Sequence, residues 1–276
     1  MYSLDLIKDI IPFLKDIESP EKEAEDILLF ASSITKNILY RDNPIVTPLI
    51  IKKIESITKR RALHEPLQYI FGKIEFLGLT IKVGTGVLIP RPETELVTLE
   101  AINQIKNHCC NSVLDLCSGS GCIALSIARE FPNICVSATD NSDVTLNYAK
   151  DNADQNHIKN VTFIKSSLFD GIISKTFDLI ISNPPYIKTS VINTLQPEIR
   201  LYEPIDALDG GEDGLYFYRE ILKHASKFLN PNGMIILEIG FDQGQDIRII
   251  AKDSGFRHVE IKQDFANKDR IAIIHE

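Results

Sequence analysis

The chain has 276 residues, 44% hydrophobic and 25% charged, an ordinary globular composition whose length predicts about two domains. The formal net charge of −8, from 30 basic and 38 acidic side chains, argues against nucleic-acid binding over the whole surface and against an anionic membrane as partner. We find no signal pattern and no apolar run near the ~18 residues of a membrane span. Five cysteines crowd into residues 109–135, and neither they nor the six histidines show ligand spacing. We therefore expect a soluble, cytoplasmic protein with reduced thiols and no bound metal.

Residues 1–63 carry helical periodicity and little else. Apolar residues recur at i, i+3, i+4 and i+7 from Ile7 to Leu14, and at i, i+3, i+4 and i+7 from Ala24 to Ala31. Two N-cap and proline pairs, Ser19-Pro20 and Thr47-Pro48, predict helix starts, and Pro12 predicts a break within the first pattern. This first domain is expected to be a small helical bundle that serves structure or docking.

Residues 64–92 read HEPLQYIFGKIEFLGLTIKVGTGVLIPRP and change in character. Apolar and β-branched runs punctuated by glycines predict one or two hairpins, in which Tyr69 and Phe71 serve packing. This segment is therefore expected to link the helical bundle to the remaining chain. At its end, Arg91, Glu93 and Glu95 either cap the next helix or close over a site, and the sequence does not separate the two.

Residues 93–276 alternate between strand-like and helix-like segments. Strands are predicted at 112–116, 134–140, 161–166, 178–182, 233–240, 258–265 and 269–276, and helices at 93–105, 122–130, 144–156 and 215–229. This pattern predicts an α/β fold with a doubly wound, mostly parallel seven-stranded sheet and an antiparallel last strand. Ligands of such sheets collect at the carboxyl ends of the strands.

The first candidate site lies in VLDLCSGSGCIAL, residues 113–125. A strand runs into Gly119 and Gly121 and a helix starts at once, so the backbone can approach a ligand closely. Asp140 ends the next strand, where a carboxylate can accept bonds from both ribose hydroxyls. Asp115 is expected to face the same crevice and could hold an amino group. The glycine pattern alone also describes a plain tight turn, but with strand, helix and acid in place it favours nucleoside binding.

The second candidate is Asn183-Pro184-Pro185-Tyr186, which follows the fourth predicted strand of the sheet. Two prolines remove two backbone donors and fix two φ angles, so the strand stops in a stiff loop. Asn183 offers an amide, the Pro184 carbonyl offers an acceptor and Tyr186 offers a flat ring. Alone it would be a strand-capping turn, but beside a ribose-binding loop it suits a planar amide or amine.

These motifs resemble those of amino-group methyltransferases that use S-adenosylmethionine. More narrowly, the chain is similar to the class I protein-(glutamine-N5) methyltransferases of peptide chain release factors, the PrmC/HemK family. The resemblance covers residue 64 to the C-terminus, with a helical N-terminal domain as in the family, and it rests on EPLQYIFGKIEF, LIPRPETE, DLCSGSG, NPPY and LYEPIDALDGGEDGLYFYREIL. It implies methyl transfer to the glutamine of the GGQ loop of class 1 release factors, with no nucleic acid or membrane as partner, and we expect a monomer.

The resemblance also implies roles for single residues. The segment Cys117, Ser118, Gly119, Ser120 and Gly121 wraps the methionine part of the cofactor. Asp140 holds the ribose, Leu168 lies against the adenine, and Asn183 touches both cofactor and substrate. The substrate amide is clasped by Asn183, Pro184, Pro185 and Tyr186, with Asn183, Pro184 and Tyr186 in catalytic roles. The family usually has Gly-Thr at 117–118, so this loop has to accommodate a Cβ at Cys117. The family often has an acid where Ser167 stands, a position that bears on recognition of the adenine N6.

Other classes stay open at this stage. A DNA or ribosomal RNA amino-group methyltransferase (N6-adenine or N2-guanine) shares NPPY but would bring a basic target-recognition segment, which the sequence lacks. A nicotinamide oxidoreductase would share the glycine loop and leave NPPY unexplained, and a non-catalytic assembly factor could keep the whole fold. The segment 209–214 is either a substrate-facing loop or a plain turn, and Glu238 and Gln243 are interpreted as structural.

Overall fold

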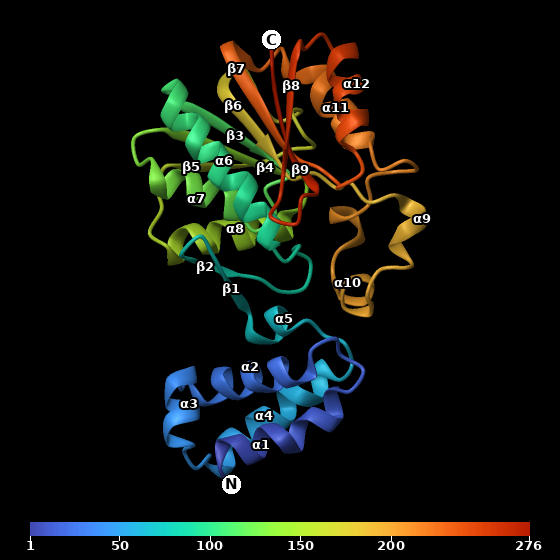
Figure 1. Ribbon diagram of the computed structural model, residues 1–276. Coiled ribbons are helices and arrows are strands. Elements are labelled where there is room, and N and C mark those ends of the chain that lie inside the picture. The colour runs from blue at the N-terminus through green and yellow to red at the C-terminus, as the bar shows by residue number, and fades with distance from the viewer. The chain divides into compact units, whose positions relative to one another are not determined.

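The computed structural model describes all residues, 1–276, and divides them into two compact units (Figure 1). The N-terminal unit comprises Met1–Gly72 together with Gln196–Tyr202. The C-terminal unit comprises Lys73–Leu195 and Glu203–Glu276. None of the helices in the chain combines the length and the apolar character that crossing a membrane requires.

The N-terminal unit is a bundle of short helices. They are α1 (Ser3–Ile10), η1 (Ile11–Leu14), α2 (Pro20–Ser32), α3 (Lys36–Asp42), α4 (Pro48–Arg61), α5 (Leu67–Phe71) and, from later in the chain, α10 (Pro197–Tyr202). The apolar positions that gave the helical pattern, such as Leu14, Ile27 and Leu28, are fully buried in one core. The predicted break at Pro12 is confirmed, because the chain passes there from α-helix to a 3-10 turn.

The two predicted helix starts differ in their caps. Thr47 accepts a hydrogen bond from the Ile50 amide, as an N-cap should, at 3.5 Å. Helix α2 does begin at Pro20, but the Ser19 side chain caps nothing, and this part of the prediction is wrong. The Ser19 backbone has φ −135° and ψ 67°, outside the extended conformation that aims an N-cap side chain at the helix.

Residues 67–71 form helix α5 and not the predicted hairpin. Phe71 stacks on Phe30 of the bundle with ring centroids 4.0 Å apart, and Gly72 ends the helix in the left-handed conformation at φ 73°. Packing against the bundle core therefore overrides the local β-branched composition. The predicted hairpin follows as β1 (Lys73–Phe76) paired with β2 (Leu79–Lys82), joined by a turn at Leu77-Gly78.

The C-terminal unit is built on one seven-stranded sheet in the order β5-β4-β3-β6-β7-β9-β8. Its strands are β3 (Ser112–Leu116), β4 (Cys135–Asp140), β5 (Val161–Lys165), β6 (Phe177–Ser182), β7 (Leu229–Glu238), β8 (His258–Gln263) and β9 (Asp269–His275). The pairs among β3 to β7 are parallel, and β9 is antiparallel to both of its neighbours. The predicted fold class, with an antiparallel last strand, is confirmed.

Helices cover both faces of the sheet (Figure 1). One group contains α6 (Pro92–His108), α7 (Cys122–Glu130) and α8 (Asp143–Gln155), and the other contains α11 (Tyr216–Ala225) and α12 (Gly244–Asp253). The sequence pattern predicts no element at α12, whose residues in the core are Ile247, Ile250 and Ala251. Leu114 and Leu116 of β3 point into the core on the α11 and α12 face. The alternation of a strand therefore turns Asp115 to the other face.

The N-terminal unit contains a buried ion-pair cluster that yields a stability prediction. The Arg61 side chain is 4% exposed and contacts the carboxylates of Glu23 on α2 and Glu198 on α10. Arg61→Ala leaves both acids without their partner, so we expect about 3 kcal/mol of lost stability, near the low end for buried pairs because both acids are partly hydrated. Denaturant unfolding followed by circular dichroism measures this loss.

The matched control is Arg41→Ala, which removes an arginine from a solvent-exposed pair with Asp42 in the same unit. Exposed pairs contribute little, so its unfolding midpoint should stay at the wild-type value. Equal midpoints for the two variants would show that the Arg61 cluster does not hold α10 and α2 together.

Candidate active site

The loop between β3 and α7 turns its backbone toward a cavity at the carboxyl edge of the sheet. Cys117, Gly119 and Gly121 all have left-handed φ, at 57°, 56° and 81°. A Cβ placed on Gly119 would meet no atom within 4 Å, so this glycine faces open space. A Cβ on Gly121 would lie 3.1 Å from the Ala149 Cβ, so the second glycine permits close packing on α8. The two glycines thus have separate tasks, ligand approach and helix packing.

Asp140 lies at the end of β4 beside this loop. Its Oδ2 accepts from the Gly119 amide at 2.9 Å, and its Oδ1 accepts from the Ser142 amide at 3.0 Å. A carboxylate has about four lone-pair positions, so two stay available toward the cavity that Asp140 lines. The backbone therefore fixes this acid in place with acceptor capacity left for a ligand.

The cavity brings together most of the predicted site. Its lining includes Cys117, Ser118, Gly119, Ser120, Asp140, Leu168, Asn183 and Pro185. Four other predicted residues do not line it: Asp115, Gly121, Pro184 and Tyr186. Further lining residues, to which the sequence alone gave no individual role, come from the β2–α6 segment, from α6 and from α11, among them Leu88, Pro90, Thr94 and Phe217. They lie within the quoted segments LIPRPETE and LYEPIDALDGGEDGLYFYREIL, but only the tertiary fold shows that they reach the cavity.

Asp115 was expected to face the crevice, but it is fully buried beneath the loop. Its Oδ2 accepts from the Ser118 hydroxyl at 2.6 Å, which fixes the loop from below. Burial raises the pKa of Asp115 to about 7. Its position follows from the strand alternation that turns Leu114 and Leu116 toward the opposite core. In this structure Asp115 supports the loop from within the protein.

Two thiols line the same cavity, at Cys117 and Cys122. Burial raises the pKa of each thiol to about 12, so both stay neutral at physiological pH. A neutral thiol is a poor nucleophile and behaves as a small apolar group. These side chains shape the cavity and carry no charge into it.

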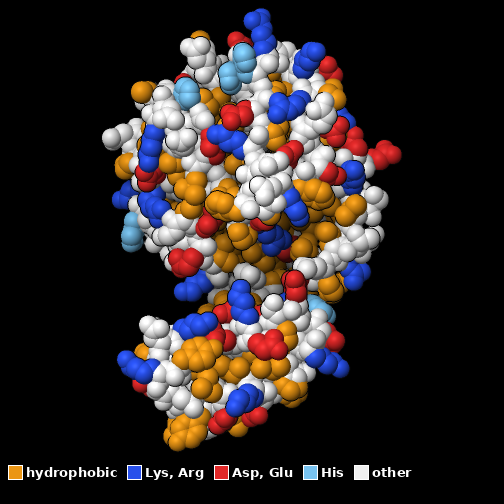
Figure 2. All heavy atoms as spheres, in the orientation of Figure 1, with side chains coloured by type: hydrophobic (Ala, Val, Ile, Leu, Met, Phe, Trp, Pro, Cys, Tyr) orange, Lys and Arg blue, Asp and Glu red, His pale blue; other side chains and the backbone are white.

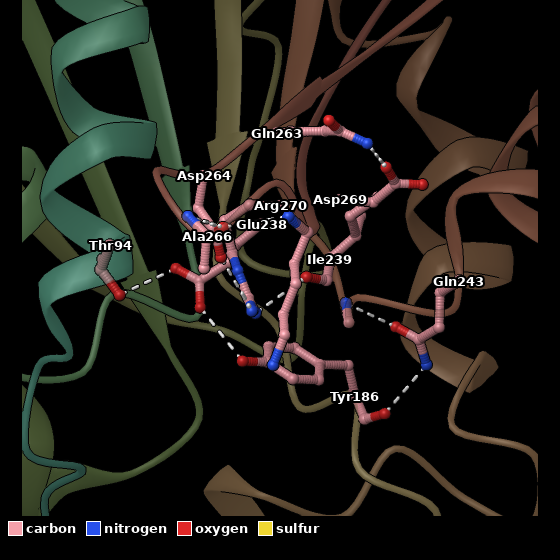
Figure 3. A network of polar contacts seen from close by, with 12 residues as sticks. Thr94, Tyr186, Glu238, Ile239, Gln243, Gln263, Asp264, Ala266, Asp269 and Arg270 are labelled. Carbon is pink, nitrogen blue, oxygen red and sulfur yellow. Dashed lines mark hydrogen bonds and ion pairs between the residues drawn. The ribbon is translucent and has the colours of Figure 1, made fainter.

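The NPPY loop follows β6 and is held by contacts from three directions. The Asn183 Nδ2 donates to the Thr94 hydroxyl of α6 at 3.2 Å. The Tyr186 hydroxyl donates to Glu238 Oε1 at the end of β7 at 3.2 Å, and the Tyr186 carbonyl accepts from Gln243 Nε2 at 3.0 Å (Figure 3). The loop therefore holds its shape through side chains that the sequence analysis interpreted as structural or did not mention.

Glu238 is the buried acid of this group. Its Oε2 accepts from the Thr94 hydroxyl at 2.8 Å, and the Arg270 side chain lies close by in Figure 3. Burial raises the pKa of Glu238 to about 7, while the hydrogen bond from Thr94 and the charge of Arg270 act in the opposite direction. The Tyr186 phenol, partly buried and next to this acid, has a raised pKa because of desolvation and the Glu238 charge, and it stays a hydrogen-bond donor.

Segment 209–214 lies against the back of the NPPY loop. The Gly210 amide donates to the Ile187 carbonyl at 2.8 Å, and the Ile187 amide donates to the Leu208 carbonyl at 2.9 Å. A Cβ on Gly210 would come 2.7 Å from the Tyr186 Cα, and one on Gly214 would come 2.6 Å from the Tyr186 carbonyl oxygen. These glycines thus permit close backbone packing, and the segment supports the loop from behind.

Two of the three charged residues around the start of α6, Arg91 and Glu95, have defined partners. Arg91 pairs with the buried Glu203, and the Glu95 carboxylate accepts from the Leu77 amide in the β1–β2 turn at 2.8 Å. Arg91 is the N-cap residue of α6 but makes no side-chain cap bond. Two of the three residues therefore tie the helix start to neighbouring segments.

Comparison with known proteins agrees with this architecture. The family model described as "Methyltransferase small domain" matches residues 97–198, and the one described as "PrmC N-terminal domain" matches residues 5–72. Among solved structures, the hMettl16 catalytic domain in complex with an RNA hairpin is similar in fold, with a TM-score of 0.60 at 15% identity over 90% of this chain and 92% of that chain. At this identity the likeness concerns the fold alone.

Curated relatives extend the similarity over the full length. The release factor glutamine methyltransferase of Thermodesulfovibrio yellowstonii is 43% identical and covers 100% of this chain and 99% of its own. The protein of the same name from Geobacter sulfurreducens is 39% identical over 93% of this chain and 90% of its own. With this identity over both units, and with the glycine loop and NPPY at one cavity, the chain belongs to the release factor glutamine methyltransferase family.

Proposed function

We propose that the protein transfers a methyl group from S-adenosylmethionine to the side-chain amide nitrogen (N5) of the glutamine in the GGQ loop of class 1 release factors. The observation that carries this proposal is that Asn183 lines the same cavity as the Asp140–Gly119 pair. One cavity thus holds a loop suited to bind an amide and an acid suited to bind ribose hydroxyls. This combination fits a methyl donor that contains a nucleoside and a substrate whose amide accepts the methyl group.

The residues at the cavity fit S-adenosylmethionine. The open space above Gly119 admits a ligand against the backbone, and the free lone pairs of Asp140 suit two ribose hydroxyls. Leu168 offers an apolar surface on the same cavity for the adenine ring. Cys117 carries its Cβ in the left-handed conformation, at φ 57°, which glycine adopts more easily.

The chain's own residues then act on the substrate nitrogen. S-adenosylmethionine supplies a methyl group already activated by its sulfonium. An amide nitrogen is a weak nucleophile. Asn183 Oδ1 and the Pro184 carbonyl oxygen therefore accept hydrogen bonds from its two N–H groups, which favours a more electron-rich, pyramidal nitrogen. Orientation and fixed dipoles lower the barrier here without a covalent nucleophile, and the proton leaves after transfer.

We also propose that the helical N-terminal region docks the protein substrate. Residues 1–63 contribute a hydrophobic core of their own and contain no cluster of catalytic side chains. In this division of the chain, residues 64–92 are the linker and residues 93–276 the methyltransferase domain. Figure 2 shows hydrophobic side chains at the surface of this unit among charges of both signs. Exposed large apolar side chains of the unit include Phe13, Tyr40, Ile45, Leu49 and Leu63. Such residues suit contact with a folded protein.

A methylation assay tests the proposed function. The protein is incubated with methyl-labelled S-adenosylmethionine and, separately, with a release factor, the same factor with the GGQ glutamine replaced by alanine, DNA, and RNA. We expect label on the unaltered release factor alone, because the clamp is shaped for an amide. Label on nucleic acid would favour the amino-group methyltransferases that share NPPY, and equal label on the alanine form would contradict glutamine as the acceptor.

Cofactor affinity supplies a second prediction. Asp140→Ala removes the acceptor assigned to the ribose, and we expect the Kd for S-adenosylhomocysteine to rise at least ~10-fold, the scale of one or two charge-assisted hydrogen bonds. Isothermal titration measures this directly. Asp143→Ala, three residues further on and paired at the surface with Lys165, removes the same charge outside the cavity and should leave the Kd unchanged. Equal affinities for both variants would remove Asp140 from the cofactor site.

Turnover supplies a third prediction. Asn183→Ala keeps the ribose acid and the glycine loop but loses an acceptor aimed at the substrate amide. We expect cofactor affinity within roughly tenfold of wild type and a kcat reduced ~10²-fold or more, the scale of one lost transition-state contact. Rapid-quench assays with a release factor separate the two quantities. Wild-type kcat in this variant would exclude Asn183 from the reaction.

A further inference from the structure

The amide of Asn183 belongs to a chain of hydrogen bonds that ends on a buried acid. Asn183 and Tyr186 come from the loop after β6, Thr94 from the first turn of α6, and Glu238 from the end of β7. The links run from Asn183 Nδ2 to Thr94 Oγ1, from Thr94 Oγ1 to Glu238 Oε2, and from the Tyr186 hydroxyl to Glu238 Oε1. Figure 3 shows Thr94 and Tyr186 approaching the Glu238 carboxylate from opposite sides.

Counting donors fixes the direction of each link. An ionised carboxylate only accepts, so the single hydroxyl hydrogen of Thr94 and that of Tyr186 both go to Glu238. Having used its one hydrogen, the Thr94 oxygen can only accept from Asn183. Asn183 therefore turns its NH₂ group to Thr94. Its carbonyl oxygen, the acceptor that the substrate amide requires, is left for the cavity.

We propose that Thr94 and Glu238 are positioning residues that keep the Asn183 carbonyl oxygen directed at the substrate amide. This inference deepens the proposed function and rests on it. Neither residue needs to touch the reacting atoms, because each acts through the orientation of Asn183. If the Asn183 amide were rotated by 180°, its NH₂ group would face the N–H groups of the substrate, and donors would face donors.

The charges around Glu238 make this arrangement dependent on pH. Tyr186 from the NPPY loop, Arg270 of β9 and Glu93 of α6 face it, and Arg270 favours the charged form while Glu93 opposes it. Burial raises the pKa of Glu238 to about 7, so the acid is ionised above that pH and takes a proton below it. Once protonated, Glu238 can donate to the Thr94 oxygen, whose own hydrogen then points at Asn183 and favours the inverted amide. Turnover at saturating cofactor should therefore fall as the pH drops below about 7.

Variants of the two residues test the proposal. Thr94→Val removes the hydroxyl at nearly constant volume, and Glu238→Gln replaces one acceptor oxygen by a donor. For both we expect a kcat for release-factor methylation reduced ~10²-fold, the scale of one lost transition-state contact, with a Kd for S-adenosylhomocysteine within roughly tenfold of wild type. Thr94→Ser restores the hydroxyl and should recover most of the lost turnover. The fall in kcat below neutral pH should disappear in Glu238→Gln. It should persist in Asp115→Asn, which alters the other buried acid with a raised pKa near the cavity.

The matched control is Thr98→Val, one turn further along α6. Thr98 is as buried as Thr94, but its hydroxyl bonds only to the Thr94 backbone carbonyl, at 2.8 Å. The two valine variants should lose similar stability in thermal unfolding, and only Thr94→Val should lose turnover. Wild-type kcat in Thr94→Val, or an equal loss in Thr98→Val, would overturn the proposal.

A second readout does not depend on methylation. In protein labelled with ¹⁵N-asparagine, the Asn183 NH₂ signal, assigned by its loss in Asn183→Ala, should exchange slowly with solvent in the wild type. In Thr94→Val it should shift and exchange faster, because its acceptor is gone. If the wild type methylates no release factor, the proposed function fails while this signal still decides the orientation of Asn183. An Asn183 signal that is the same in both proteins would contradict the role of Thr94.

Discussion

The burial of the Glu238 carboxylate between Thr94, Tyr186 and Arg270 is the interaction on which the rest of the site depends. A buried acid without partners is strongly unfavourable, so the fold must bring donors to it. The hydroxyls of Thr94, at the start of α6, and of Tyr186, in the loop after β6, donate to this carboxylate, and Arg270 of β9 contributes a positive charge. Satisfying one charge therefore fixes three segments of the chain around the end of β7, and the NPPY loop is one of them.

Glu238 and the neighbouring Gln243 also connect the NPPY loop to helix α11. The Tyr218 hydroxyl of α11 donates to the Glu238 carbonyl at 2.9 Å, and Gln243 bonds the carbonyls of both Tyr186 and Gly214. The backbone of the NPPY loop is thus held from the α11 face while Thr94 holds its amide from α6. The stiffness supplied by two prolines would mean little without these contacts, because prolines fix φ angles but not the place of a loop. The chain after this loop continues into α10, which belongs to the N-terminal unit, and returns at Glu203, whose carboxylate pairs with Arg91.

Much of this architecture follows from the sequence, and the exceptions have physical causes. The alternation of strand and helix patterns predicts the parallel sheet. The motifs after β3, β4 and β6 are then expected to lie close together, because the carboxyl ends of parallel strands share one edge of the sheet. The direction of Asp115 did not follow, since β3 is buried on both faces and its residues do not alternate in polarity. Helix α5 was missed because contacts with the bundle outweighed its β-type composition. Thr94 and Glu238 lie 144 positions apart, so only the tertiary fold shows that they meet.

The most direct test of this account is a crystal structure of the protein with S-adenosylhomocysteine and a release-factor fragment that carries the GGQ loop. The account predicts the glutamine amide nitrogen within ~3 Å of both Asn183 Oδ1 and the Pro184 carbonyl oxygen, ordinary hydrogen-bond distances. It also predicts that the Asn183–Thr94–Glu238 chain of bonds is intact and that Asp140 contacts the ribose. A glutamine amide held by other groups, or an Asn183 side chain turned away from Thr94 in that complex, would contradict it.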